Sequence, residues 1–98
     1  MILFLRRKWF DMIANYEKME EYRVQSPYNM KQFWRFCDMN PDDRIIEFRR
    51  GYTKTAITRR CTAALLWPQA GYGNCWQLRE EWGFERGKKL IVYCLARS

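Results

Sequence analysis

The chain has 98 residues, of which 48% are hydrophobic and 17% are aromatic. The length fits one domain, residues 1–98, and the composition excludes a disordered segment, because such segments combine low hydrophobicity with high net charge. The formal net charge of +7 comes from 18 basic and 11 acidic residues. A basic domain attracts polyanions over long distances, so nucleic acid is the first partner to consider.

The residue types present limit the chemistry available to the chain. It contains no histidine, and its four cysteines are widely spaced, without a Cys-x-x-Cys pair. This pattern argues against zinc, so we expect no metal and no cofactor. Without histidine there is no Ser-His or Cys-His nucleophile pair, so catalysis would use Lys, Glu, Asp, Tyr, Thr or Cys. We interpret Cys61 and Cys94 as small buried hydrophobic residues and assign no function to them or to Cys75.

The hydrophobic pattern gives no membrane segment. No run approaches the roughly 20 apolar residues that a membrane span requires. The apolar start at residues 2–5 is followed at once by Arg6, Arg7 and Lys8, which is too short and in the wrong order for a signal peptide. A long basic amphipathic helix that could lie on an anionic membrane is also missing. We therefore expect a soluble cytoplasmic protein with no membrane partner.

The first expected element is a short strand at residues 2–5, a continuous apolar run bounded by charge that predicts burial on both faces. Residues 7–15 follow as an amphipathic helix, in which apolar side chains recur at intervals of three and four residues: Trp9, Met12, Ile13 and Tyr16. We expect Asn15 to close this helix in the left-handed conformation. Residues 19–24 form the next expected strand.

A second helix is expected to begin at Ser26 and Pro27, which supply a capping hydroxyl and a proline at the first helical position. Apolar residues at helical spacing give this helix one apolar face: Met30, Phe33, Trp34 and Cys37. Residues 40–43 have the composition of a turn and end it.

Three further strands are expected in the second half of the chain, at residues 44–50, 57–67 and 88–96. Residues 51–55 form a loop, Pro68 stops the longest strand, a turn spans residues 70–74, and one helical turn spans residues 76–81. The last strand is expected to be buried on much of both faces. Five short strands and two helices predict an α+β domain with a small mixed β-barrel and the helices packed beside it.

The aromatic residues divide into two expected groups. Packing in the core or between helix and barrel is expected for Trp9, Phe33, Trp34 and Trp82. Exposure is expected for Trp67 and Tyr72, which flank the turn at Pro68. We interpret Gly83 and Gly87 as the turn that enters the last strand.

Five charged residues fall within residues 16–23, directly after the first helix. Their informative members are Lys18, Glu21 and Arg23, which together can bind an anion or move a proton. Strand alternation puts Glu21 and Arg23 on one face, so Lys18 joins them only from the turn before the strand, or after a bulge. The alternative is a charged edge strand kept soluble by surface ion pairs.

Four stretches, in this order, resemble the ASCH domain of the PUA-like superfamily: residues 8–13, 17–23, 48–54 and 81–88. The hallmark of this family is Gly-x-Lys-x-x-Glu-x-Arg, and Lys18, Glu21 and Arg23 fall on its three charged positions. Tyr16 stands where the family has glycine, so we expect the turn to be displaced onto Asn15 or Glu17. The resemblance runs nearly end to end.

The resemblance implies a PUA-like mixed barrel with two helices beside it and a cleft into which the motif side chains project. The family is associated with binding RNA or nucleotides, so an RNA- or nucleotide-binding module is our first hypothesis. In it, Lys18, Glu21 and Arg23 line a cationic cleft that holds a phosphate or a base. Arg23 is the first candidate, because its planar guanidinium suits bidentate phosphate binding.

A basic region around the loop at Gly51 supplies a second group of ligand-binding candidates: Arg49, Arg50, Tyr52, Lys54 and Arg59, with Arg60 beside them. Cations with an interleaved aromatic residue suit single-stranded RNA. The residues Arg6, Arg7 and Lys8 can extend this surface. The alternative interpretation is a solvated charged face without a ligand.

Two other functions stay open. The chain is a metal-independent ribonuclease or an amidohydrolase of a modified nucleoside if Glu21 is the catalytic base and Lys18 an electrostatic stabiliser. One branch with the ASCH-like fold deacylates modified cytidine with a Lys, a Thr nucleophile and a Glu, but here Glu21 occupies the position of that Thr. The chain is instead a protein-interaction module if residues 19–24 present an exposed, unpaired strand edge.

Overall fold

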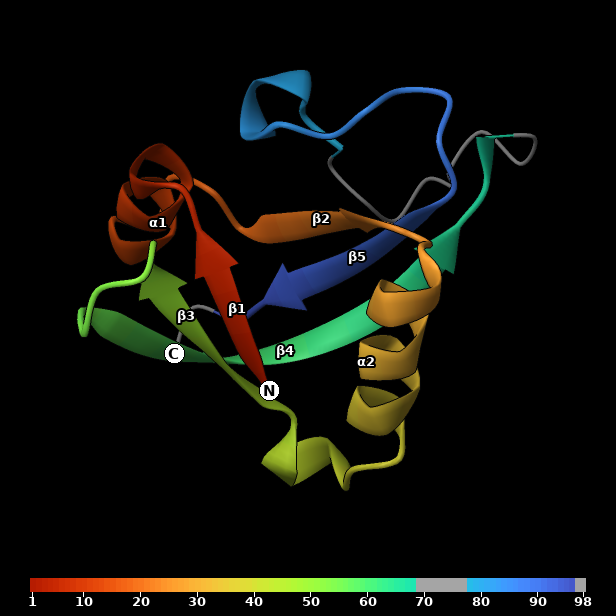
Figure 1. The fold of residues 1–98 in the computed structure, drawn as a ribbon, viewed down its shortest axis with the longest axis horizontal. Helices are drawn as coiled ribbons and strands as arrows, with labels where there is room; N and C mark the ends of the chain where they lie inside the picture. Colours follow the sequence, from red (N-terminus) through yellow and green to blue (C-terminus); the bar gives the residue numbers. More distant parts are fainter. Residues whose placement is uncertain (69–77, 97–98) are drawn as a thin grey trace.

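The computed structural model of the chain describes residues 1–68 and 78–96. Within these ranges the main elements follow one another as β1 (Ile2–Leu5), α1 (Arg7–Ala14), β2 (Glu20–Val24), α2 (Pro27–Cys37), β3 (Ile45–Arg50), β4 (Ala56–Leu66) and β5 (Leu90–Leu95). Two short 3-10 helices, η1 (Pro41–Asp43) and η3 (Glu80–Trp82), precede β3 and β5. The strands curl into a half-barrel, and the two helices lie beside it (Figure 1). The predicted α+β class and barrel-like sheet are confirmed.

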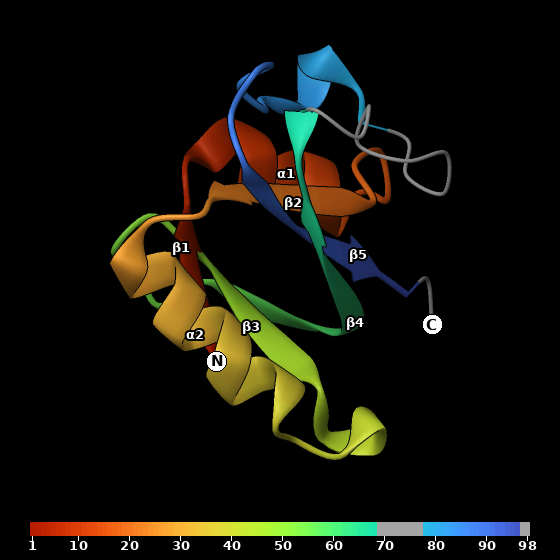
Figure 2. The same ribbon diagram turned by 90° about the vertical axis from the view of Figure 1, so that its right-hand side faces the viewer.

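The sheet is mixed, with strand order β1-β3-β4-β5-β2. β1 runs parallel to β3, and the other neighbours are antiparallel. β4 belongs to both halves of the sheet, because residues 56–60 pair with β3 and residues 61–66 pair with β5. The view in Figure 2 shows β4 passing from one half to the other. This shared strand lets the sheet curl until its two edge strands, β1 and β2, approach each other.

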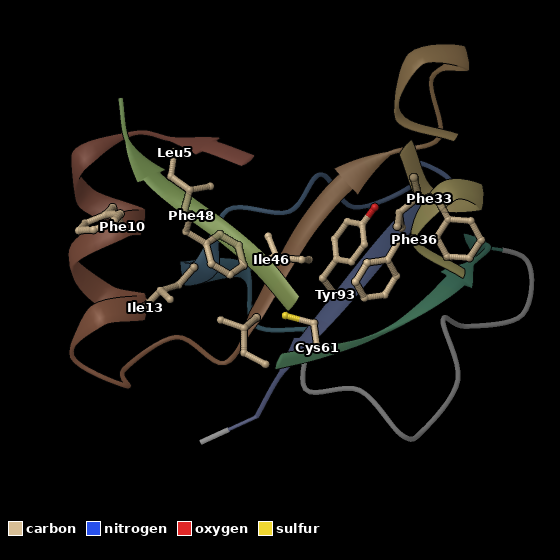
Figure 3. Packing of buried hydrophobic residues seen from close by; sticks show 11 residues of the cluster. Leu5, Phe10, Ile13, Phe33, Phe36, Ile46, Phe48, Cys61 and Tyr93 are labelled. Carbon is tan, nitrogen blue, oxygen red and sulfur yellow. The ribbon is translucent and has the colours of Figure 1, made fainter. Parts of the chain in front are cut away.

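The core fills the inside of the curl. Buried side chains from both helices and from β3, β4 and β5 form one cluster there, which includes Phe10, Ile13, Phe33, Phe36, Ile46, Phe48, Cys61 and Tyr93 (Figure 3). A second cluster lies against the other face of β5 and contains Tyr22, Leu66, Trp82, Phe84, Leu90 and Val92. β5 therefore contributes to both clusters, which confirms its predicted burial on both faces.

The end of α1 differs from the prediction. Asn15 has φ −91°, and Tyr16 instead takes the left-handed conformation with φ 61°. The amide N–H of Glu17 donates to the Met12 carbonyl at 2.8 Å, and that of Tyr16 to the Ile13 carbonyl at 3.1 Å, which is the bonding pattern of a Schellman motif. The expected displacement of the turn onto Asn15 or Glu17 is therefore wrong.

Several burial predictions also change. β1 is an edge strand with Ile2 and Phe4 exposed, so its expected burial on both faces is wrong. Trp34 is exposed on α2, whose buried side chains are Phe33 and Phe36, so its expected core position is wrong as well. The loop after β3 and the exposure of Trp67 agree with expectation.

Part of the predicted segment before β5 lies outside the described residues. This holds for the turn at residues 70–74, for Tyr72 and for Cys75. The helical turn expected at residues 76–81 begins outside them as well, and the structure places a 3-10 helix at Glu80–Trp82.

Candidate functional site

Lys18 lies in the turn between α1 and β2, as the predicted convergence of the charged residues requires. Its backbone N–H donates to the Met12 carbonyl at 3.1 Å, within the turn that Tyr16 begins. Its side chain is 0% exposed, and its Nζ lies 2.6 Å from Glu21 Oε1. The ammonium also faces the rings of Trp9 and Tyr22, at 5.1 and 5.7 Å from their centroids. Lys18 is thus a buried cation that pairs with Glu21 in the protein interior.

Glu21 is buried and joins the two cations. Its Oε1 accepts from Lys18 Nζ and from the backbone N–H of Tyr22, at 2.6 and 3.2 Å. Its Oε2 accepts from Arg23 Nη2 at 3.1 Å. Both carboxylate oxygens are therefore engaged, as a buried carboxylate requires.

Arg23 forms the accessible end of this chain of ion pairs. Its side chain is 28% exposed, and Nη2 also donates to the Phe4 carbonyl across the gap between β2 and β1, at 3.3 Å. The Nε atom of Arg23 is buried and has no hydrogen-bond partner among the described residues. A buried donor without an acceptor is rare in folded proteins. Because this atom is shielded from solvent, the accessible part of Arg23 lies elsewhere on its side chain, which is partly exposed.

The electrostatics of Lys18 follow from its burial. Loss of solvent lowers its pKa from the ordinary value of 10.5, and the nearby Arg23 acts in the same direction. The Glu21 carboxylate opposes this shift through its charge and its hydrogen bond. The attraction between Lys18 and Glu21 therefore offsets part of the cost of burying both charges.

Arg23 and Glu21 line a cleft of about 270 Å³, which we call the cationic cleft. Its walls come from the end of β1, the start of α1, β2 and η3, and its lining residues are Phe4, Leu5, Arg6, Trp9, Glu21, Tyr22, Arg23, Trp82 and Gly83. Figure 1 shows η3 as the light-blue turn above β2. Two arginines and one carboxylate line the cleft, and that carboxylate is also paired with Lys18, so the lining favours an anion.

Gly83 closes one wall of the cationic cleft. Its φ is 90°, and a Cβ built on it would lie 2.6 Å from Trp9 Cζ2. Only glycine therefore allows the chain after η3 to approach Trp9 this closely. The predicted turn at Gly83 is confirmed, and its contact with Trp9 was not predicted.

The residues of the predicted basic region do not form one surface, and two of them lie close to Phe4 of β1. Arg49 pairs with Glu47 at 2.5 Å, and its guanidinium lies 5.9 Å from the Phe4 ring. Tyr52 packs on the same ring, with centroids 5.2 Å apart. Arg49 and Tyr52 are therefore brought near Arg23 through Phe4.

The other members of that region lie elsewhere. Arg50 Nε is 3.3 Å from Asp11 Oδ1 on α1, and the guanidinium of Arg59 stacks on the Tyr16 ring at 4.8 Å. Both cations thus contact α1 or the turn that follows it. Lys54 is exposed in the loop between β3 and β4.

Sequence reasoning missed several lining residues. Trp9 was predicted to pack in the core or between helix and barrel, and its contribution to the cleft wall depends on the distant Gly83. The Phe4 carbonyl gave no signal, because any residue carries one. Arg6 was predicted only as an extension of the basic region, and its position directly after β1 places it in the cleft.

Comparisons with known proteins add no assignment. No family model matches the chain, and no curated protein or solved structure matches it significantly.

Among residues 1–68 and 78–96, no group of three or more Cys, Asp or Glu side chains is arranged to hold a metal ion. In the same part of the chain, none of the helices has the length and apolar character needed to cross a membrane.

Proposed function

We propose that the chain is an RNA- or nucleotide-binding module, and that the cationic cleft holds a phosphate through Arg23 and Arg6. The observation that carries this proposal is the Arg23 guanidinium, which is fixed by Glu21 and the Phe4 carbonyl while its side chain stays 28% exposed and lines the cationic cleft. A guanidinium held in one orientation loses little entropy on binding, and its remaining N–H groups match phosphate oxygens.

Lys18 and Glu21 act in this proposal as positioning residues. Lys18 has no exposed surface and does not line the cleft, so it does not contact the ligand. It neutralises part of the charge of Glu21, which in turn orients Arg23. This assignment replaces the direct contact between Lys18 and phosphate that the motif alone indicates.

The enzymatic alternative has less support. A general base needs an oxygen free to take a proton from the substrate, and both oxygens of Glu21 already accept hydrogen bonds. The interaction-module alternative agrees with the position of β2 at the edge of the sheet, where β5 is its only partner among the described strands. It is weakened because Glu20, Glu21 and Tyr22 of this strand are buried, which leaves little of the edge accessible to another chain.

The test is binding of a short single-stranded RNA, measured by fluorescence anisotropy at several salt concentrations. For a single strand the slope of log K against log salt is about −0.7 per phosphate neutralised, so three to five contacts give roughly −2 to −3.5. Arg23→Ala removes a charged hydrogen-bond donor and should weaken binding by roughly 10- to 150-fold.

The matched control is Arg35→Ala, which removes the same charge from the exposed face of α2, away from the cationic cleft. We expect it to weaken binding only slightly. Binding that does not depend on salt, or equal effects of the two substitutions, would refute the assignment of the phosphate site to the cleft.

A further inference from the structure

A second hollow of about 250 Å³ lies next to the cationic cleft. Both hollows share Phe4 and Arg23. Along β1 the second hollow is lined by the residues before Phe4, and the cationic cleft by the residues after it. Figures 1 and 2 show β1 between α1 and α2, and the second hollow takes its other wall from the start of α2. The two hollows therefore adjoin each other at Phe4 and Arg23.

Aromatic rings dominate the second hollow, which we call the aromatic pocket and define by Phe4, Tyr28, Tyr52, Asn29, Gln32 and Arg23. Tyr52 is 94% exposed and Tyr28 is 70% exposed. The Tyr52 ring lies beside the Phe4 ring, with centroids 5.2 Å apart and an interplanar angle of 33°. Exposed rings around one hollow offer the flat faces on which bases stack, whereas single exposed aromatic residues need no explanation.

Besides Arg23 and the tyrosine hydroxyls, the polar groups of the aromatic pocket are two side-chain amides, and no carboxylate of the described residues lines it. Asn29 Nδ2 donates to the Val24 carbonyl at 3.0 Å, and Gln32 Nε2 donates to the Tyr28 hydroxyl at 3.2 Å. These bonds orient both side chains through their nitrogen atoms. Within the described part of the chain no hydrogen bond engages the side-chain oxygen of either residue. Two oriented acceptors thus border the rings.

We propose that the aromatic pocket is a base subsite, in which a nucleobase stacks on Tyr52 and Phe4 and donates its N–H groups to Asn29 and Gln32. The inference rests on the proposed function, because the phosphate attached to this base lies at Arg23 in the cationic cleft. The pocket volume is below the roughly 300–1,000 Å³ of sites for drug-sized ligands, so it suits one base rather than a whole nucleotide.

The experiment compares two labelled single-stranded oligonucleotides of equal length and equal phosphate number, one with bases and one abasic. We expect the unaltered protein to bind the base-bearing strand at least fivefold more tightly. Tyr52→Ala should weaken binding of that strand by roughly 5- to 150-fold, the usual contribution of one base-aromatic stack, and leave abasic binding unchanged. Because Tyr52 is almost fully exposed, this substitution is compatible with folding.

Trp34→Ala is the control, since Trp34 is exposed on α2 and does not line the pocket. Equal binding of the two strands, or an unchanged affinity of Tyr52→Ala, would overturn the base subsite while the phosphate site stands. Binding of neither strand would overturn both proposals. Competition with the four nucleoside 5′-monophosphates assigns the ligand as a free nucleotide if they displace the strand, and as a nucleotide within a strand if they do not.

Discussion

Tyr16 shows how a single backbone conformation places the buried lysine. A left-handed conformation costs a residue other than glycine about 1–2 kcal/mol. The two hydrogen bonds of the Schellman motif and the stacking of Arg59 on the Tyr16 ring offset this cost. The turn then delivers Lys18 to Glu21. The sequence predicted that Lys18 joins Glu21 and Arg23 only from the turn or after a bulge, because strand alternation is a local property. It could not predict that Tyr16 keeps the left-handed position, because Arg59 is distant in sequence.

Gly83 is the residue at which the wall of the cationic cleft is most tightly constrained. Gly83→Ala would add strain at φ 90° to a Cβ contact of 2.6 Å with Trp9. We expect the free energy of unfolding to fall by about 2–4 kcal/mol, since positive-φ strain and overpacking add. Urea unfolding followed by circular dichroism measures the change.

Gly87→Ala is the matched control for this prediction. Gly87 has nearly the same φ, 89°, but a Cβ built there meets no atom within 4 Å. It should lower the free energy of unfolding by only about 1 kcal/mol. If both substitutions lower the free energy of unfolding equally, the close approach of Gly83 to Trp9 does not contribute to the effect of Gly83→Ala.

At the scale of elements, α2 connects local sequence signals to the aromatic pocket. The Ser26 hydroxyl accepts from the Asn29 N–H at 3.1 Å, so the predicted cap also holds the first turn that presents Tyr28 and Asn29. We expect Ser26→Ala to lower the free energy of unfolding by about 0.5–2 kcal/mol, because a backbone donor loses its acceptor. Thermal unfolding of the two proteins measures the loss.

Ser26→Asp provides the comparison, since aspartate is an equally good cap. This variant should retain most of the stability that alanine loses. A loss as large as that of Ser26→Ala would mean that the capping hydrogen bond is not what Ser26 contributes.

The elements that the sequence predicted best are those defined by local periodicity. The spacing of Phe33 with its apolar neighbours located α2, and the alternation in β5 located a strand buried on both faces. The prediction that β1 is buried on both faces was wrong, because an apolar run has the same appearance in an edge strand and in a central strand. Its position at the edge depends on strand order, which the sequence pattern does not contain.

At the scale of the molecule, the curled sheet creates the candidate site. The edges β1 and β2 stand at opposite ends of the strand order, yet Arg23 Nη2 reaches the Phe4 carbonyl at 3.3 Å. Both hollows lie along this seam, by which we mean the contact between β1 and β2 at Phe4 and Arg23. The sequence identified Arg23 from its motif position and charge, but the seam depends on how all five strands curl. This is why Asn29 and Gln32, polar residues on a helix, gave no signal of a pocket.

The core as a whole makes the molecule sensitive to alkaline pH. Burial raises the pKa of Tyr93 from 10.0 to about 12 and that of the Cys61 thiol from 9.0 to about 12. Each group keeps its proton in the folded state over a range in which the unfolded chain loses it. The stability that they contribute is complete below pH 9 and is lost as the pH rises toward 12. Lys18 acts in the opposite direction, because its lowered pKa makes its contribution rise with pH up to 10.5.

We therefore expect the free energy of unfolding to fall between pH 9 and 11, since the buried acids outnumber the one buried base. Urea unfolding at a series of pH values measures the slope, which is about 1.4 kcal/mol per pH unit for each proton. Tyr93→Phe removes the phenol but keeps the ring that packs on Phe36 at 5.4 Å, so its slope above pH 10 should be shallower. The same slope in Tyr93→Phe as in the unaltered chain would show that the Tyr93 proton is not linked to folding.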